Sequence, residues 1–406
     1  MASVTTTRRL IAVSWCMPPA LFPRSIQVSR LLKGLHLRGW RSTVVTRRTD
    51  NLSTGGFLDH GLAELGAPHY TLAPIEANDD RQWVDRAAAT VKEIDRVAPA
   101  AALITFAQPW RDHLAGLELA RWRRRRPWIA HFSDPWVDSA YYPKVSSEQR
   151  ALDCQREAQV IEHADAVVFT NTHAADLVMA KYPDSWRDKA KVVSHSMDRT
   201  TMPRIETLPA SADRPLRITY VGQLAGQRTA NGLFEAVALL AKRRAIEGQL
   251  ELTFVGDSGA LSDAKAMAAA SGLAQLTTFV ATVSHAESLA AMGSGDLLVL
   301  VDAPAAVNVF LPSKFADYLM ADKPILGLTP AVGASADALR AIGHRVIDPA
   351  DAGGIADAIE VMLDQHAAGT LMLPPGAREQ TERYSLEATA AAFAVIVEEA
   401  IDKRAR

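Results

Sequence analysis

Short apolar runs alternate along the chain with longer stretches in which apolar positions recur at a helical period. In the first half these runs are LIAVSW, STVVT, AALITF, WIAHF, AVVFT and KVVSH. A second series begins near Leu216 and comprises LRITYVG, LELTFVG, LTTFVAT, DLLVLV, PILGL and HRVID. Amphipathic stretches such as SIQVSRLLKGLHLRG lie between them, with Ile26, Leu31, Leu32 and Leu35 on one face. This alternation predicts parallel sheets covered by helices.

A segment with neither a helical nor a strand-like pattern of apolar positions separates the two series. The segment DRTTMPRIETLPASADRP is rich in Pro, Thr, Ser and Asp, and we interpret it as an interdomain linker. The predicted fold class is therefore α/β, with two doubly wound, Rossmann-like domains at 1–205 and 206–385. Loops at the carboxyl ends of both sheets are expected to line a cleft between them. A long amphipathic helix at 386–406 either closes the second domain or crosses back to the first.

The composition narrows the class of protein. The chain has 406 residues, is 48% hydrophobic and carries a formal net charge of −2, which is typical of a globular protein and gives no reason to expect nucleic acid. Its two cysteines, Cys16 and Cys154, fit a reducing compartment. No apolar stretch approaches the roughly 20 residues of a membrane span. We expect a cytoplasmic protein.

Several common site motifs are absent from the sequence. There is no Gly-x-Gly-x-x-Gly after a first strand, no Walker loop and no Cys or His pair at zinc-ligand spacing, which argues against a dehydrogenase, a P-loop enzyme and a zinc site. A Gly-x-Ser-x-Gly hydrolase elbow is also lacking. No Asp-x-Asp occurs, so the usual carboxylate pair for a metal-bound sugar nucleotide is missing.

The stretch FLPSKFADYLMADKPIL places a lysine at the N-terminus of a predicted helix, where the helix dipole already gives a partial positive charge. Ser313 is the expected N-cap, so Lys314 falls at the first helical position, against the helix dipole. Asp317 lies three residues on and shares its face. A surface Lys–Asp pair is one interpretation. The other is an anion site, in which Lys314 and free N–H groups hold a phosphate and Asp317 accepts from ribose hydroxyls.

A second basic residue follows the first strand of the second domain. In ITYVGQLAGQRTANGLFEAV the strand ends at Gly222 and Arg228 precedes a helix that starts near Asn231. By itself Arg228 is more often an exposed loop arginine. Its place at the carboxyl edge of the sheet would bring it to the same cleft as Lys314.

The first domain contains the unusual stretch RPWIAHFSDPWVDSAYYP. A strand ends near His131, and Asp134-Pro135-Trp136 leaves it, so a carboxylate and aromatic rings could bind hydroxyl-rich rings there. The alternative is a capped turn with Trp136 in the core. The Pro-rich loop SWCMPPALFPRS after the first strand could shape an acceptor site.

The basic run Arg121–Arg126 ends a predicted helix. A solvated helix end is the default interpretation, because cations suit a helix C-terminus. The alternative is a peripheral membrane contact with anionic lipid head groups at the inner face of a membrane, helped by Trp122 and Trp128.

Four motifs together resemble those of GT-B glycosyltransferases of the large retaining group, the glycosyltransferase family 4 type, which includes bacterial transferases of polysaccharide biosynthesis and lipid-linked sugars. They are PWIAHFSDPW, KVVSHSMD, YVGQLAGQR and LPSKFADYLMADKPIL, and the last is the most specific. The family usually has Gly at the position of Ser196 and also at that of Asp322, in a turn where we expect little effect.

The resemblance implies roles for individual residues. Lys314 and Arg228 would neutralise the diphosphate of a nucleotide sugar, and Asp317 replaces the family's ribose-binding Glu. Gly222 is the loop glycine, and Gln223 stands where an Arg is common. Ser313 belongs to the same donor signature. Where the family has a second acid, this chain has Val309 beside Asn308, which we include among the donor contacts. His131 or Asp134 would contact the donor sugar or the acceptor.

The implied reaction is transfer of a sugar to a hydroxyl acceptor (a saccharide, a lipid-linked sugar or a small molecule), with retention and without a metal or other cofactor. Two other functions are compatible with the fold. A nucleotide-sugar 2-epimerase shares the two-domain shape but takes no acceptor. A non-catalytic GT-B partner protein need not keep the pair Arg228 and Lys314.

Overall fold

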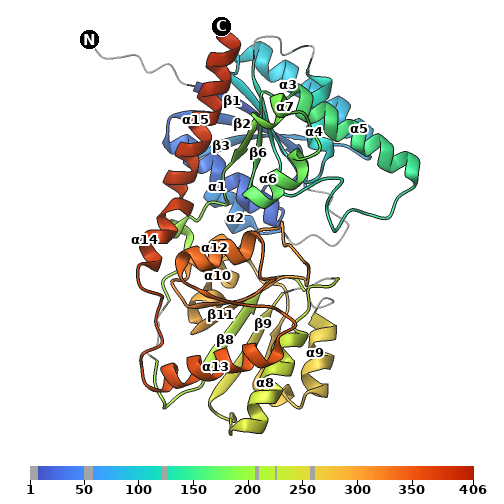
Figure 1. The fold of residues 1–406 in the computed structure, drawn as a ribbon. Coiled ribbons are helices and arrows are strands. Elements are labelled where there is room, and N and C mark those ends of the chain that lie inside the picture. The colour runs from blue at the N-terminus through green and yellow to red at the C-terminus, as the bar shows by residue number, and fades with distance from the viewer. Residues whose placement is uncertain are drawn as a thin grey trace. The chain divides into compact units, whose positions relative to one another are not determined.

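The computed structural model describes residues 8–49, 58–120, 122, 126–205, 210–224, 226–256 and 261–406 (Figure 1). The chain forms two compact units. The first comprises Met1–Ser196 and Tyr384–Arg406, and the second comprises Met197–Arg383. The predicted boundary after residue 205 therefore differs from the observed one. The segment that begins at Met197 packs with the second unit, where the Asp198 N–H lies 3.1 Å from Met320 Sδ.

The first unit is built on a seven-stranded sheet in which every pair is parallel, in the order β3-β2-β1-β4-β5-β6-β7. Its strands are β1 (Arg8–Val13), β2 (Trp40–Arg47), β3 (Tyr70–Ile75), β4 (Ala102–Phe106), β5 (Trp128–His131), β6 (Ala166–Phe169) and β7 (Ala190–Val192). Its helices are α1 (Pro23–Leu37), α2 (His60–Gly66), α3 (Asp80–Val97), α4 (Arg111–Glu118), α5 (Ser147–His163), α6 (Thr172–Met179), α7 (Asp184–Arg187) and α15 (Leu386–Ala405).

Alternation along β1 creates the two layers of core in this unit. Leu10 and Ala12 pack with α1 and α15, whereas Ile11 and Val13 pack with α3 on the other face. Both faces are buried, as expected of a parallel sheet. The last helix of the chain, α15, runs beside α1 and contributes Phe393 to this core (Figure 1).

The second unit has a six-stranded parallel sheet in the order β10-β9-β8-β11-β12-β13. Its strands are β8 (Leu216–Val221), β9 (Leu250–Val255), β10 (Thr277–Val280), β11 (Leu297–Val301), β12 (Ile325–Leu328) and β13 (Arg345–Ile347). Its helices are α8 (Asn231–Arg243), α9 (Leu261–Ala270), α10 (His285–Ser294), α11 (Lys314–Met320), α12 (Ala334–Ile342), α13 (Ala352–Ala367) and α14 (Ala377–Thr381). Short 3₁₀ turns occupy Arg199–Thr201, Ala274–Leu276 and Glu382–Tyr384.

The predicted α/β class with two Rossmann-like sheets is confirmed, and each predicted apolar run overlaps a strand. The exception is β3, which the sequence analysis missed. It is an edge strand that contains Pro74, and Leu72 is 36% exposed, so no continuous apolar run marks it. On α1, Leu31, Leu32 and Leu35 are buried as predicted, while Ile26 is half-buried.

Candidate active site

The helix that carries Lys314 stands at the point in the second sheet where the strand order reverses. Strands β8 and β11 are neighbours there, and the next strands in sequence lie on opposite sides. Ligands of open α/β sheets bind at this edge. Helix α11 is fixed there by Tyr318, which is fully buried: its hydroxyl accepts from the Val221 N–H at 3.0 Å and donates to the Val299 carbonyl at 3.0 Å.

The Lys314 ammonium is buried without a hydrogen-bond partner among the described residues. The residue as a whole is half-buried, but its Nζ has no appreciable exposed surface and lies 3.9 Å from the centre of the Tyr220 ring. Burial lowers the pKa of Lys314 well below its ordinary value, and the nearby Arg228 lowers it further, while Asp302 acts in the opposite direction. The side chain is therefore held where an anion would stabilise its charged form.

The predicted loop residues after β8 lie beside Lys314. Gly222 has φ +136°, a conformation that favours glycine, and its backbone passes so close to the amine that a Cβ placed on it would come 2.8 Å from Lys314 Nζ. Gln223 is exposed, and its carbonyl accepts from the Tyr220 hydroxyl at 3.0 Å. Arg228 is half-buried, and its Nε has no hydrogen-bond partner in the described part of the chain. The structure thus brings Gly222, Arg228 and Lys314 together.

Asp302 directly follows β11 and completes this group, and the sequence analysis missed it. The side chain is 2% exposed, and its Oδ2 accepts from Asn308 Nδ2 at 2.7 Å and from Thr329 Oγ1 at 2.8 Å. Burial raises the pKa of Asp302, and the nearby cations of Arg228 and Lys314 oppose that shift. Asn308, predicted as a donor contact, also bonds the Phe310 backbone, so its amide positions Asp302.

The predicted N-terminal anion site of α11 needs correction. Ser313 occupies the N-cap position but has helical backbone angles (φ −57°, ψ −35°), and its side chain caps no N–H group. The Phe315 and Ala316 N–H groups donate to the Pro312 and Ser313 carbonyls instead. A tight first turn therefore satisfies these groups, and they are not available to a phosphate.

Asp317 faces a different neighbour from Lys314. Asp317 is buried, with 7% of its surface exposed. Its Oδ1 lies 3.7 Å from Nε2 of His285, the first residue of α10. The interpretation of Lys314 and Asp317 as a surface ion pair is therefore wrong. The sequence analysis did not single out His285.

In the first unit His131 ends β5 and is buried against Arg24. One guanidinium nitrogen of Arg24, Nη2, lies 2.9 Å from His131 Nδ1 and donates to the His131 carbonyl at 3.0 Å. Burial, with Arg24 as the next cause, lowers the pKa of His131 well below its ordinary value, so the ring is neutral at physiological pH. Asp134 is half-buried and accepts a long hydrogen bond of 3.4 Å from Gln108 Nε2.

Trp136 lies in the core, as one of the two interpretations predicted. It is 3% exposed and stacks on Trp110 with the ring centroids 5.1 Å apart and the planes 5° from parallel. Its ring is therefore not available to stack on a sugar. Within the Asp-Pro-Trp turn, Asp134 is then the residue with a polar side chain.

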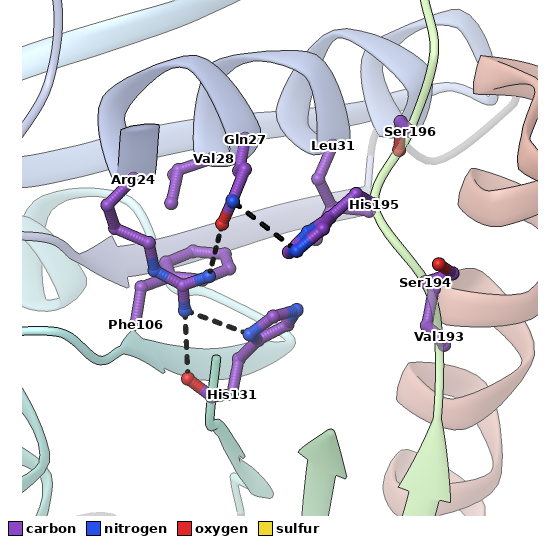
Figure 2. A pocket seen from close by; sticks show the side chains of 10 residues that line it. All are labelled: Arg24, Gln27, Val28, Leu31, Phe106, His131, Val193, Ser194, His195 and Ser196. Atoms are coloured by element: carbon purple, nitrogen blue, oxygen red, sulfur yellow. Dashed lines mark hydrogen bonds between the residues drawn. The ribbon is translucent and has the colours of Figure 1, made fainter. Parts of the chain in front are cut away.

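A pocket at the carboxyl ends of β4 and β5 was not predicted. Arg24, Gln27, Val28 and Leu31 of α1 line it together with Phe106, His131 and the segment 193–196 (Figure 2). Gln27 Oε1 accepts from Arg24 at 3.2 Å, and Gln27 Nε2 lies 3.4 Å from His195 Nε2. The only sequence signal was an arginine early in an amphipathic helix.

The loop after β1 is anchored by a buried carboxylate. Asp112, at the start of α4, accepts from the Trp15 N–H at 2.7 Å and from Trp83 Nε1 at 2.7 Å. Burial raises the pKa of Asp112 to about 7, although these hydrogen bonds act to lower it. The guanidinium carbons of Arg47 and Arg111 lie 4.8 and 4.3 Å from the centre of a Trp15 ring. These contacts hold Trp15, near the start of the predicted acceptor loop, against the first unit.

Most of the basic run lies outside the described residues, namely 121 and 123–125. Arg126 is described, and it pairs with Asp95 at 2.8 Å. No described helix is both long enough and apolar enough to cross a membrane. Among the described residues no group of three or more His, Cys, Asp or Glu side chains could hold a metal ion.

Comparison with known protein families identifies a domain in the first unit. Residues 25–194 match the model of the glycosyl transferase 4-like domain. The chain therefore contains a glycosyl transferase 4-like domain. The matched domain is that of enzymes that transfer sugars, and the predicted resemblance is confirmed.

Several solved structures resemble this chain over nearly its whole length, which supports the GT-B fold. Sucrose-phosphate synthase from Thermosynechococcus elongatus is 18% identical, with a TM-score of 0.72 over 98% of this chain and 100% of its own. HepE of Anabaena, solved with UDP-glucose, is 11% identical, with a TM-score of 0.69 over 96% and 99%. A protein from Listeria monocytogenes described as a UDP-N-acetylglucosamine 2-epimerase is 13% identical, with a TM-score of 0.62 over 97% of each. A comparison with curated protein sequences finds no significant match.

Proposed function

We propose that the protein transfers a sugar from a nucleotide-diphosphate sugar to a hydroxyl acceptor, with retention of configuration and without a metal ion. The observation that carries the proposal is the Lys314 ammonium, buried beside Arg228 at the switch point of the second sheet and without a hydrogen-bond partner among the described residues. A diphosphate is the ligand chemistry that would relieve the repulsion between these two cations. UDP-glucose bound to the similar HepE supports this class of donor.

The charge that develops in the reaction fits this arrangement. The bond between the anomeric carbon and the diphosphate oxygen breaks, and negative charge grows on the leaving group. Lys314 and Arg228 would stabilise that charge in a buried setting, where electrostatic interactions are strong. They would also neutralise the diphosphate, a role that a divalent metal ion has in metal-dependent transferases. Asp302 would orient the cations, since it faces both and is itself fixed by Asn308 and Thr329.

The remaining residues would position the sugar and the acceptor. Asp317 would accept from the ribose hydroxyls. For retention, the acceptor hydroxyl would attack from the face of the leaving group, and its proton would pass to a leaving phosphate oxygen. No enzymic nucleophile is required. Asp134 would contact a hydroxyl group at the edge of the first sheet. His131 is held by Arg24 and would line the wall of the site.

The decisive test is Lys314→Met, with Lys242→Met on the exposed side of α8 as the matched control. If Lys314 meets charge that grows in the transition state, turnover at saturating donor falls by on the order of 10²–10³, and KM alone does not account for the loss. Normal turnover in Lys314→Met would refute the role of Lys314. The control variant is expected to match the wild type.

Two further experiments test the absence of a metal and distinguish a transferase from an epimerase. Activity that persists in EDTA supports transfer without metal, and complete loss with rescue by one divalent ion would contradict it. Product analysis with the nucleotide sugar and no acceptor distinguishes an epimerase, which would change the donor sugar by itself. The epimerase from Listeria shares the fold only, and the fold does not decide between the two reactions.

A further inference from the structure

A buried histidine faces Asp317 from the neighbouring helix. His285 is 6% exposed and Asp317 is 7% exposed, and His285 Nε2 lies 3.7 Å from Asp317 Oδ1. Hydrogen bonds between nitrogen and oxygen have lengths of about 2.7–3.2 Å, so these two atoms face each other across a gap slightly wider than a hydrogen bond. If Asp317 belongs to the nucleotide site, its buried neighbour lies beside the same ligand.

Both residues stand at the edge of the second sheet where ligands bind. His285 is the first residue of α10, which follows β10, and Asp317 lies in the first turn of α11, which follows β11. Because the strands of this sheet are parallel, these helix starts lie at its carboxyl edge. Helix α10 packs against β8 and α11. The pair therefore shares an edge of the sheet with Lys314 and Arg228.

Each member of the pair is held by the start of its helix. Ser284 and Glu287 form a capping box at α10, in which Ser284 Oγ accepts from the Glu287 N–H at 3.2 Å and Glu287 Oε2 accepts from the Ser284 N–H at 2.8 Å. Helix α11 is fixed by the buried hydroxyl of Tyr318, one residue after Asp317. Two rigid elements thus set the distance between His285 and Asp317, which favours selective binding.

The chemistry of the pair matches a hydroxyl group. A carboxylate only accepts hydrogen bonds, whereas an imidazole Nε2 that carries a proton donates. A hydroxyl both accepts and donates, and its oxygen, at about 2.8 Å from each atom, would bridge the gap between Nε2 and Oδ1. A phosphate or carboxylate group would be repelled by Asp317. The ligand group that fits is therefore a neutral hydroxyl.

We propose that His285 and Asp317 together bind one ribose hydroxyl of the donor nucleotide, with His285 as the hydrogen-bond donor and Asp317 as the acceptor. His285 is then a specificity-determining residue, which makes the site select ribonucleotides over deoxyribonucleotides. This role rests on the proposed function, because it needs a nucleotide whose diphosphate lies at Lys314 and Arg228. Asp317 alone would supply the acceptor but not the donor.

The experiment measures nucleotide binding to the full-length protein by calorimetry. UDP, ADP and GDP are compared first, and the one that binds most tightly is then compared with its 2′-deoxy and 3′-deoxy forms. We expect the wild type to bind one deoxy form at least about tenfold more weakly, because the buried pair is left without the hydroxyl that it binds. Equal affinities for all three forms would overturn the proposal.

Substitutions of the histidine test whether it causes that preference. His285→Leu keeps a side chain of similar size without a donor. It should weaken binding of the ribonucleotide about tenfold and binding of the deoxy form much less, so that the preference is lost. His285→Gln places an amide N–H near the position of Nε2 and should keep most of the preference. His60→Leu, at an exposed histidine that is also the first residue of its helix, is the matched control and should retain it in full.

A purely structural role of His285 gives a different result. In that case His285→Leu lowers the affinities for the ribonucleotide and the deoxynucleotide by the same factor, or changes neither, and the proposal is wrong. If the melting curve shows that the leucine variant does not fold, His285→Asn takes its place. Its shorter amide does not reach the position of Nε2, so it should lose the preference as well.

Failure of the donor site itself is seen separately through Lys314. Lys314→Met should weaken binding of the ribo and deoxy forms by the same factor and leave the preference unchanged, because the ammonium would contact phosphate and not ribose. No nucleotide binding by the wild type, or binding that Lys314→Met does not weaken, would contradict the proposed donor site. Binding that depends on Lys314, with a preference that does not depend on His285, would contradict the role of His285 alone.

Discussion

At the level of single residues, two basic side chains are buried in an unusual way. Lys314 in the second unit and Arg24 in the first each lie at the edge of a parallel sheet without a carboxylate bonded to them among the described residues. They differ in how they tolerate burial. Burial lowers the pKa of Lys314 well below its ordinary value, whereas burial lowers the pKa of Arg24 only to about 10, so Arg24 stays charged.

The lowered pKa of Lys314 predicts that binding of a nucleoside diphosphate takes up a proton. An anion beside Nζ favours the charged amine and so raises its pKa toward 10.5. Calorimetry of UDP binding at mildly alkaline pH, in two buffers of different ionisation enthalpy, measures the uptake. Heats that do not depend on the buffer would contradict the prediction, and Lys314→Met should abolish the difference.

The same residue predicts a pH dependence of stability in the ligand-free protein. Between its lowered pKa and 10.5, the unfolded chain binds more protons than the folded one. The free energy of unfolding therefore rises with pH through that window. Urea unfolding at several pH values should show this rise in the wild type and a flatter profile in Lys314→Met. The opposite slope would mean that Lys314 has a bound counter-charge in the free protein.

Asp317 gives a separate prediction about the nucleotide. If it holds the ribose hydroxyls through charge-assisted hydrogen bonds, Asp317→Ala should weaken UDP binding by about 1.5–3 kcal/mol. Titration calorimetry measures the change, with the melting temperature as the check on folding. An unchanged affinity would leave Asp317 with its observed neighbour, His285, and a structural role only.

At the level of elements, the end of α11 holds a residue in an unusual conformation. Asp322 has φ +52°, in the left-handed region, and its carboxylate pairs with Arg199 at 3.1 Å and with Arg378 at 3.5 Å. Glycine suits this backbone better than any residue with a Cβ. Asp322→Gly and Asp322→Ala lose the same ion pairs. The difference between their free energies of unfolding therefore measures the cost of the left-handed backbone conformation. We expect the glycine variant to be more stable by about 1 kcal/mol in urea unfolding. Equal stabilities would show that the turn relaxes.

The elements were predictable because most apolar runs form buried strands, as in β4 and β11, and Lys314 was found because its position conflicts with the helix dipole. The edge strand β3 was missed because it buries little. Asp302, Arg24 and His195 were missed for another reason. Each is unremarkable in its own segment, and only the crossover connections bring it beside its partners. Ser313 was misjudged because the tight backbone turn at Pro312 replaces a side-chain cap.

At the scale of the whole molecule, the first unit depends on the last helix of the chain. Phe393 is fully buried in the core between α1 and α15. Phe393→Ala should destabilise this unit by about 3–5 kcal/mol through lost burial and a cavity. Hydrogen exchange should accelerate in β1 and β4 and stay unchanged in β8 and β9. Val395→Ala, an exposed position on the same helix that is 50% accessible, is the control. Faster exchange in both sheets would show that the two units unfold together.

The discontinuous first unit has a consequence for how the protein folds during its synthesis. The ribosome delivers Met1–Ser196 first, but the helix that covers one face of that sheet belongs to the last 23 residues, Tyr384–Arg406. The second unit, Met197–Arg383, is continuous and can close as soon as it emerges. We therefore expect the second unit, although it is made later, to reach its native state earlier. Until α15 is made, Leu32 and Leu35 of α1 stay uncovered in the nascent first unit, and this is the part that a chaperone would hold.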